Sequence, residues 1–408
     1  MRKIAGYLML GMASLWGADA LASGYQLNEY SANGLGRAFA GSGVVGDDYS
    51  AIAYNPAGMS LKDSGMQVGV SFVEMYSDAR GRIADPATDA TLRDGPAGRL
   101  RLIKTLPHGF AQYKVNNELA LGMGVYTPFG LATEYNSDWF GATHGIKTDL
   151  EVVDIATGFS YKIIPEISVG ASFILRYVAG DIINQPLLAY PSSRNRMNLD
   201  GWGWGTNFGI MYEPTKNTRI GFSYRSSPAH TVKGDHEVTT PLGFQRYDGK
   251  STMTLPSQFL LSGYHKLNDK FALTASARYT EWSIFDDFVM TSSMPAAQSI
   301  PERWKDAWTV SLGMDYYHDD AWTFRTGIAF DETPIPSRQF RTARIPDADR
   351  YWLSLGFSYK YENMTFDVGY AHLFMRKSES ENRENGSVLY ANYHSHSNML
   401  SVQMQYDF

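Results

Sequence analysis

Three arginines in the 408-residue sequence stand within stretches that alternate between apolar and polar side chains. Arg176, Arg278 and Arg325 each fall on the polar side of that alternation. A guanidinium binds a carboxylate through charge-assisted hydrogen bonds, so these side chains are candidates for holding an acidic ligand. The alternative is that they pair with carboxylates such as Asp331 and Asp367, or with another segment of the chain, and have a structural role.

The sequence lacks the usual signatures of catalysis. It contains no Gly-x-Ser-x-Gly elbow, no P-loop and no His-Glu-x-x-His. It contains no cysteine, which excludes disulfides and thiolate chemistry. We therefore predict that the protein is not an enzyme and has no cofactor and no metal site. An outer-membrane lipase is a distant alternative, because it would need a serine with a histidine in reach and an orienting acid or amide.

Net charge narrows the range of partners. The formal net charge is −6 at pH 7. A nucleic-acid partner would require a basic face that neutralises phosphates, so we predict no nucleic-acid binding.

The first 22 residues have the features of a secretory signal peptide. Arg2 and Lys3 form a short basic start, and residues 4–16 are mostly apolar. Ala20-Leu21-Ala22 then supplies small residues at both positions that signal peptidase requires, so the mature chain is predicted to begin at Ser23. No later apolar run reaches the roughly 18 residues that a membrane helix needs.

The segments that carry the arginines alternate between apolar and polar residues with period two, which is typical of strands with two unlike faces. The C-terminal segment shows the pattern, since one face carries Leu400, Val402, Met404, Tyr406 and Phe408. In a soluble sandwich the apolar face would meet a core, whereas in a membrane barrel it meets lipid. The export signal, the terminal Phe408 and aromatic residues beside the turns favour the barrel.

Six short polar turns recur along the sequence, each preceded by tyrosine, at residues 114–118, 162–166, 213–217, 265–269, 318–320 and 360–363. They join twelve strands in pairs, and one strand at each end makes fourteen, an even number as bacterial barrels require. Closure matters because an open edge would leave backbone groups unpaired in lipid. The strands are expected to start near Met66, Leu106, Leu119, Thr148, Ile167, Leu199, Arg219, Thr252, Phe271, Ala307, Trp322, Tyr351, Met364 and Ser397.

Residues 23–62 do not alternate and are rich in glycine. This segment is too long and too apolar for an exposed tail, so we predict that it forms a hatch that plugs the lumen. The chain is thus expected to be all-β: a fourteen-stranded antiparallel transmembrane β-barrel over residues 63–408, preceded by an N-terminal hatch at 23–62 and a signal peptide at 1–22.

Several motifs resemble the FadL family of long-chain fatty-acid outer-membrane transporters, which also includes importers of aromatic hydrocarbons. The matching stretches cover most of the chain in order: residues 23–30, 34–39, Asn55-Pro56-Ala57, 130–135, 148–151, 322–331 and 345–354. The resemblance implies the same fourteen-stranded barrel and hatch. It also implies capture by outer loops, an apolar lumen pocket, and release through a kink in strand three.

The resemblance assigns roles to particular residues. It places a kink in strand three at Pro128, Phe129 and Gly130, where the alternative is that the strand simply ends. It places a movable gate at Ser23, Gly24 and Tyr25, together with the hatch motif Asn55-Pro56-Ala57. Arg176 becomes the favoured carboxylate ligand, because the family has such a residue on strand five.

Two outer loops are unexpectedly apolar. Trp139 and Phe140 follow strand three, and Leu187 and Leu188 follow strand five. Exposed apolar clusters usually mark a binding site, so these residues are candidates for first capture of substrate; the alternative is that the loops pack together and cap the barrel.

We expect uptake of long-chain fatty acids by passive, ligand-gated diffusion across the outer membrane of a Gram-negative bacterium. Uptake of neutral aromatic hydrocarbons by the same route is the alternative within the family, and a general porin or adhesin is the alternative outside it. The expected partners are the hydrophobic substrate, outer-membrane lipid and, through Phe408, the barrel-assembly machinery.

Overall fold

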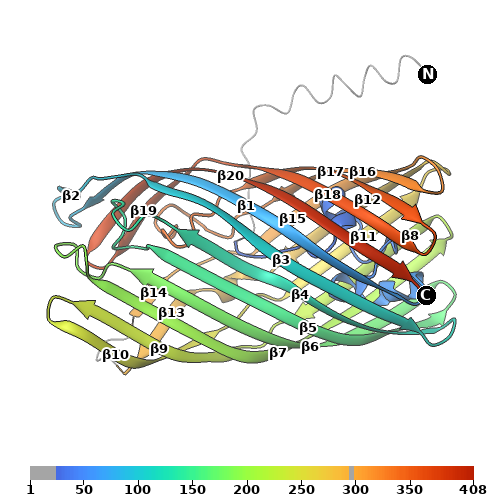
Figure 1. The fold of residues 1–408 in the computed structure, drawn as a ribbon, viewed down its shortest axis with the longest axis horizontal. Helices are drawn as coiled ribbons and strands as arrows, with labels where there is room; N and C mark the ends of the chain where they lie inside the picture. Colours follow the sequence, from blue (N-terminus) through green and yellow to red (C-terminus); the bar gives the residue numbers. More distant parts are fainter. Residues whose placement is uncertain (1–23, 294–297) are drawn as a thin grey trace, which may run out of the picture.

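The computed structural model describes residues 24–293 and 298–408 (Figure 1). The predicted signal peptide, residues 1–22, and Ser23 lie outside the described residues. In the described part of the chain no helix is both long enough and apolar enough to cross a membrane.

Fourteen strands form the wall of a closed antiparallel barrel, which confirms the predicted fold class. Each strand pairs with the next, and the last wall strand returns to pair with the first from Gly65↔Asp407 to Ala84↔Val388. The wall strands are β1 (Gly65–Ala84), β3 (Gly98–Lys114), β4 (Leu119–Glu134), β5 (Lys147–Ile164), β6 (Ile167–Asn184), β7 (Arg194–Thr215), β8 (Thr218–Ser226), β11 (Gln258–Lys266), β12 (Phe271–Thr280), β15 (Ala307–Tyr317), β16 (Trp322–Asp331), β17 (Arg350–Tyr361), β18 (Met364–Met375) and β20 (Ser387–Asp407).

The six predicted turns join the wall strands in pairs at one end of the barrel, to the right in Figure 1. The wall therefore begins and ends on this side, where the C-terminus lies. Longer connections occupy the other end and carry the short strands β2 (Thr91–Arg93), β9 (His230–Thr240), β10 (Gly243–Met253), β13 (Asp287–Ser292), β14 (Gln298–Pro301) and β19 (Ser378–Glu384).

One expected strand start is wrong. Thr252 belongs to β10, an extension at the outer end, and the wall strand β11 begins only at Gln258. Pro256 separates the two, because proline has no N–H to donate to a ladder. The strands β3, β7 and β20 begin earlier than expected, since they continue beyond the apolar band into the outer loops.

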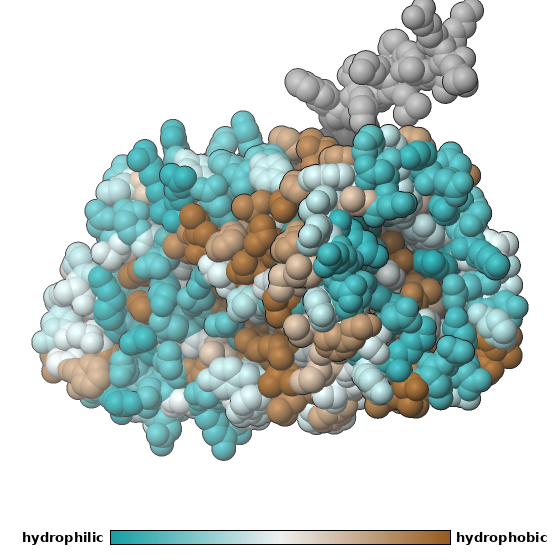
Figure 2. Space-filling view, turned by 45° about the vertical axis from the view of Figure 1, so that its right-hand side comes forward, coloured by the Kyte–Doolittle hydropathy of each residue, from teal (hydrophilic) through white to brown (hydrophobic). Residues whose placement is uncertain are grey.

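The outward face of the wall is apolar around its middle. Figure 2 shows apolar side chains gathered across the centre of the barrel, with hydrophilic surface predominating toward both ends. Exposed large side chains such as Phe173, Trp204, Phe208 and Leu353 supply this band. Charge is excluded from such a band because a lysine or arginine facing lipid near the midplane costs about 2–4 kcal/mol.

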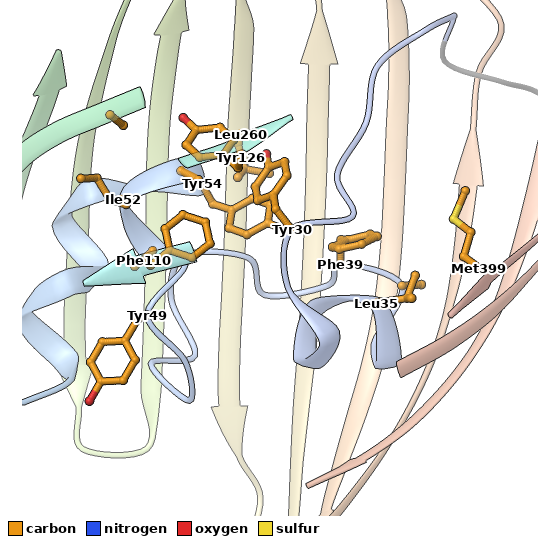
Figure 3. Close-up of a cluster of buried hydrophobic side chains, with 14 of the residues drawn as sticks. Tyr30, Leu35, Phe39, Tyr49, Ile52, Tyr54, Phe110, Tyr126, Leu260 and Met399 are labelled. Carbon is orange, nitrogen blue, oxygen red and sulfur yellow. The ribbon is translucent and has the colours of Figure 1, made fainter. Parts of the chain in front are cut away.

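Residues 24–62, the hatch, lie inside the barrel and include α2 (Ala32–Gly36), α3 (Ala51–Tyr54) and η1 (Pro56–Leu61). Figure 3 shows Tyr30, Tyr54 and the wall residue Tyr126 packed together; the Tyr30 and Tyr54 rings stack at 4.6 Å between centroids. The inward-facing side chains of the wall thus meet a core supplied by the chain's own beginning.

Wall glycines let the hatch backbone approach closely. A Cβ at Gly209 would lie 1.9 Å from Asn55 Oδ1, and one at Gly170 would lie 2.5 Å from the Pro56 backbone. On another side of the lumen, a Cβ at Gly327 would lie 2.2 Å from the Arg37 backbone. These distances are too short for any side chain, so only glycine at these wall positions lets the hatch backbone pack directly against the strands.

Polar wall side chains then bind the hatch. The Ser160 hydroxyl donates to the Ala57 carbonyl at 2.9 Å, and Gln403 accepts from the Ala32 N–H at 2.7 Å. Near the C-terminus, Asp407 accepts hydrogen bonds from the Tyr49 hydroxyl at 2.5 Å and from Lys62 at 2.9 Å. The polar face of the strands is therefore largely occupied by the hatch.

Candidate binding cavities and wall opening

The third wall strand, β4, is irregular at the predicted kink. Its pairing with β5 shifts register between Tyr126 and Phe129, which leaves Thr127 and Pro128 outside the ladder. Its pairing with β3 ends at Gly109↔Val125, and no further pair joins these strands within the described residues. Proline at this point removes a ladder donor, which accounts for the break.

The first residues of the hatch pair with β4 where its pairing with β3 has ended. Leu27 N–H donates to the Pro128 carbonyl at 2.9 Å, and Gly130 N–H donates to the Tyr25 carbonyl at 3.0 Å. Gln26 and Phe129 are thereby antiparallel bridge partners. The free edge of β4 is thus capped by a short strand-like segment, residues 25–27, rather than by its neighbour in the wall.

An apolar cavity lies beside Tyr25 at the outer part of the lumen. We call it the β7 cavity; its empty space, together with the part that opens to solvent, is about 710 Å³. Its apolar lining comes from Leu131, Leu150, Val178, Ile182, Met197, Leu199, Val232, Met253, Phe285 and Ile345.

A second cavity lies on the side of the opening where β1 and β3 run, and we call it the β1 cavity; with the part that opens to solvent, its empty space is about 740 Å³. Leu27, Val73, Met75, Leu100 and Met399 are among its lining residues. Tyr25, Leu131 and Ile345 line both cavities, so the two spaces are separated by these side chains.

Within the described residues, the Tyr25 side chain is positioned by packing against aromatic rings and not by hydrogen bonds of its hydroxyl. Its ring packs edge-on against Trp282 at 4.7 Å between centroids, and it also contacts Phe129, Phe285 and Trp304. The preceding Gly24 has φ +61 and donates its N–H to Asp347 at 2.9 Å. The positive φ favours glycine at this position.

The three candidate arginines all contact protein groups. Arg176 is fully buried, forms two hydrogen bonds with Asp154 at 2.7 and 2.9 Å and one with Ser227 at 2.6 Å, and does not line either cavity. Arg225 binds the same carboxylate. Two arginines therefore share Asp154 inside the lumen.

The other two arginines reach the hatch. Arg278 donates to Asn28, and Arg325 donates to Asp47 at 3.0 Å and to Ser358 at 2.5 Å. Asp367, one of the carboxylates suggested as a partner, accepts from Ser358, Gln403 and Gln405. These contacts favour a structural role, and a role in substrate binding stays a prediction.

The apolar loop residues differ in their surroundings. Trp139 and Phe140 are fully buried in a cluster with Tyr135 and Leu389, and the Trp139 indole donates to the Gly145 carbonyl at 2.8 Å. They pack the outer loops together, as the alternative interpretation expected. Leu187 is exposed and Leu188 is half-buried, so these two present apolar surface, and their role in capture stays a prediction.

Sequence reasoning missed the polar groups of the β7 cavity. Arg344 lies in the loop 332–349, and Glu302 lies between β14 and β15. The one available signal was that this loop, which connects two strands of the matched stretches, contains three arginines among apolar residues. Nothing in strand alternation shows where such a loop folds.

A closed barrel with an apolar band, an occupied lumen and apolar cavities beside a break in its wall is the architecture of an outer-membrane transport barrel. A family model described as "Outer membrane protein transport protein (OMPP1/FadL/TodX)" matches residues 13–408. The chain belongs to this family, which confirms the resemblance and the outer-membrane location.

Related proteins align in sequence with this chain along nearly their whole length. The long-chain fatty acid transport protein of Escherichia coli K12 is 32% identical over 405 residues, covering 88% of this chain and 90% of that protein. Outer membrane protein P1 of Haemophilus influenzae is 30% identical over the full length of both.

Solved structures show the same fold. A FadL homologue from Pseudomonas aeruginosa superposes with a TM-score of 0.86 at 25% identity, covering 95% of this chain and 100% of that one. The Pseudomonas putida toluene transporter TodX superposes with a TM-score of 0.70 at 17% identity, covering 96% of this chain and 100% of that one, which shows the fold alone.

Proposed function

We propose that this protein takes up long-chain fatty acids by passive, ligand-gated diffusion. A substrate lands on the outer loops near Leu187 and Leu188, enters the β7 cavity, passes Tyr25 into the β1 cavity, and leaves sideways between β3 and β4. An apolar solute that leaves through the wall enters the bilayer directly and never crosses a water-filled lumen.

The observation that carries this proposal is the position of residues 25–27. They cap the free edge of β4 where its ladder with β3 has ended, and Tyr25 also lines both cavities. Movement of this one segment would therefore join the cavities and uncover the break in the wall. Gating elements are drawn from parts of a protein with few stabilising backbone bonds, and two hydrogen bonds join this segment to β4.

The choice of substrate class follows the relatives. The 32% identical Escherichia coli relative is a long-chain fatty acid transport protein. Neutral aromatic hydrocarbons are the second candidate, because the cavity lining is almost wholly apolar. The presence of Arg344 and Glu302 in that lining favours a substrate with a polar end.

Assembly requires a further partner. Phe408 is the last residue, it is exposed, and its N–H donates to the Ser64 carbonyl at 3.0 Å. Its ring is therefore available for contact with the barrel-assembly machinery at the side where the wall begins and ends.

The test is competitive uptake in cells that lack other carriers. A labelled long-chain fatty acid and a labelled aromatic hydrocarbon are offered together, and uptake of each is followed with and without this protein. Preferential uptake of the acid is the expected result. Uptake of the hydrocarbon alone would transfer the proposal to the second candidate, and uptake of neither would defeat it.

A further inference from the structure

We propose that the carboxylate of the substrate binds at a polar corner of the β7 cavity formed by Arg344, Glu302, Tyr25 and Thr148, and that Arg176 does not contact it. This inference rests on the proposed function and assigns the headgroup site within it. The acyl chain would then lie along the apolar lining.

Arg344 is the cation of this corner. Its side chain is buried, one Nη donates to the His144 carbonyl at 2.5 Å, and the other pairs with Glu384. Its Nε is buried and has no hydrogen-bond partner among the described residues. One charged donor of a cavity-lining guanidinium is thus left for a ligand.

Thr148 is linked to the backbone of this arginine through its strand neighbour Thr133. Thr148 on β5 and Thr133 on β4 are directly opposite each other in the ladder, and the Thr133 hydroxyl donates to the Arg344 carbonyl at 3.2 Å. The Thr148 hydroxyl is buried, lines the cavity and has no partner in the described part of the chain. A second unused donor is therefore within the same corner.

Glu302 and Tyr25 complete the group. Glu302 is buried, and the Trp304 indole donates to one of its oxygens at 3.1 Å. Burial raises the pKa of Glu302 to about 8, although Arg344 and the indole N–H favour its anion and Glu384 opposes it. Glu302 therefore carries a proton at neutral pH and acts as a donor.

Burial, and to a smaller extent Glu302, raises the pKa of Tyr25, so its hydroxyl keeps its proton and faces the cavity as a donor. Burial also lowers the pKa of the nearby His144 to about 4, so that ring stays neutral. Each unused group at the corner can thus donate a hydrogen bond, and a carboxylate, which only accepts hydrogen bonds, is their complement.

Arg176, by contrast, has no unpaired donor and no contact with the cavity. Its guanidinium is fully buried, all three of its nitrogens bond to Asp154 and Ser227, and it lines neither cavity. A substrate carboxylate would have to displace Asp154, which also neutralises Arg225.

The site predicts a dependence on pH. As the pH rises through about 8, Glu302 loses its proton, so a donor becomes an anion beside the bound carboxylate. The charged groups that act on Glu302 are Arg344 and Glu384, which pair with each other, whereas Tyr25 and His144 stay neutral across this range. Affinity for a carboxylate should therefore fall, by up to about tenfold between pH 7 and pH 9.

The experiment compares the binding of tetradecanoate and tetradecanol to the full protein purified in detergent micelles. Arg344→Met should weaken tetradecanoate roughly tenfold or more and leave tetradecanol within about twofold. Glu302→Gln keeps a donor, so it should preserve binding at pH 7 and abolish the fall toward pH 9. Arg338→Met is the matched control, since Arg338 is in the same loop but is exposed and pairs with Glu381.

Each outcome separates the two proposals. Wild-type protein that binds neither ligand would defeat the proposed function. Wild-type protein that binds both, together with an Arg344→Met variant that loses both equally or neither, would overturn the headgroup site alone. Retained heat-modifiable migration on a gel verifies that each variant barrel is folded.

Discussion

Lys104 and Asp149 join the second and fourth wall strands across the third. The Lys104 ammonium lies 2.7 and 2.8 Å from the two Asp149 oxygens, so β3 contacts β5 directly at a level where its own ladder with β4 has ended. Ala132 of β4, the ladder partner of Asp149, is buried at this point. An ion pair therefore bridges the break in the wall that we propose as the exit.

Neutralising this bridge should ease opening of the wall. Lys104→Met removes a pair whose side chains are roughly one-third exposed, and such pairs contribute at most about 1 kcal/mol, or roughly fivefold in a rate. We expect the initial rate of fatty-acid uptake to rise by up to that factor. Time-resolved uptake of a labelled acid by whole cells measures it.

The control for this variant is Lys147→Met. Lys147 pairs with Asp181 at 2.8 Å on the same face, but it does so between β5 and β6, whose ladder is continuous there. Uptake should not change. Equal acceleration by both variants would show that surface charge, and not the bridge, sets the rate.

A disulfide between residues 26 and 129 should lock the opening. Gln26 and Phe129 are bridge partners whose flanking residues make the hydrogen bonds, an arrangement that places Cα atoms about 4.5 Å apart and within disulfide range. The chain has no cysteine, so the double variant Gln26→Cys, Phe129→Cys offers only this pair. Uptake should stop under oxidising conditions and recover with reductant.

The single-cysteine variants test whether the substitutions themselves impair transport. They should take up substrate equally with and without reductant. If the oxidised double variant transports normally, residues 25–27 are not the gate.

Replacing Gly209 by alanine should displace part of the hatch from the wall. In Gly209→Ala the new Cβ would meet Asn55 Oδ1 at 1.9 Å, so the loop around Asn55-Pro56-Ala57 must move. Single-channel recording in planar bilayers should detect increased ion conductance. Gly263→Ala is the control, because its nearest neighbour would lie at 4.0 Å, and it should remain closed.

Removal of Arg176 should damage stability rather than selectivity. Arg176→Met leaves a buried Asp154 with one fewer partner, and breaking buried pairs costs about 3 kcal/mol or more. We expect a lower midpoint of urea unfolding and equal weakening of acid and alcohol binding. A selective loss for the acid would instead assign the headgroup to Arg176.

The sequence contained enough to predict the barrel itself. Six polar turns such as residues 360–363, together with the alternation of residues 400–408, were sufficient to count fourteen strands, because lipid forces every strand to be paired and two-faced. The error at Thr252 arose where β9 and β10 extend beyond the bilayer, since strand alternation continues there without any lipid to define it.

The candidate site was harder to predict. Pro128 and Gly130 mark the irregular part of β4, because proline and glycine act on the local backbone. The residues that border the cavity come from loops distant in sequence: Tyr25, Glu302 and Arg344 meet through tertiary packing alone. Register placed the three arginines in the lumen, but it cannot show that Asp154, Asn28 and Asp47 bind them.

The contacts at the seam between β20 and β1 have a consequence for biogenesis. Asp407 belongs to the last wall strand, yet it binds Tyr49 and Lys62 of the hatch, while Gln403 holds Ala32. The last wall strand, β20, therefore closes the barrel by pairing with β1 and also binds the hatch through Asp407 and Gln403. Because one strand both completes the barrel and holds the hatch, we expect the hatch to dock in the lumen as β20 pairs with β1.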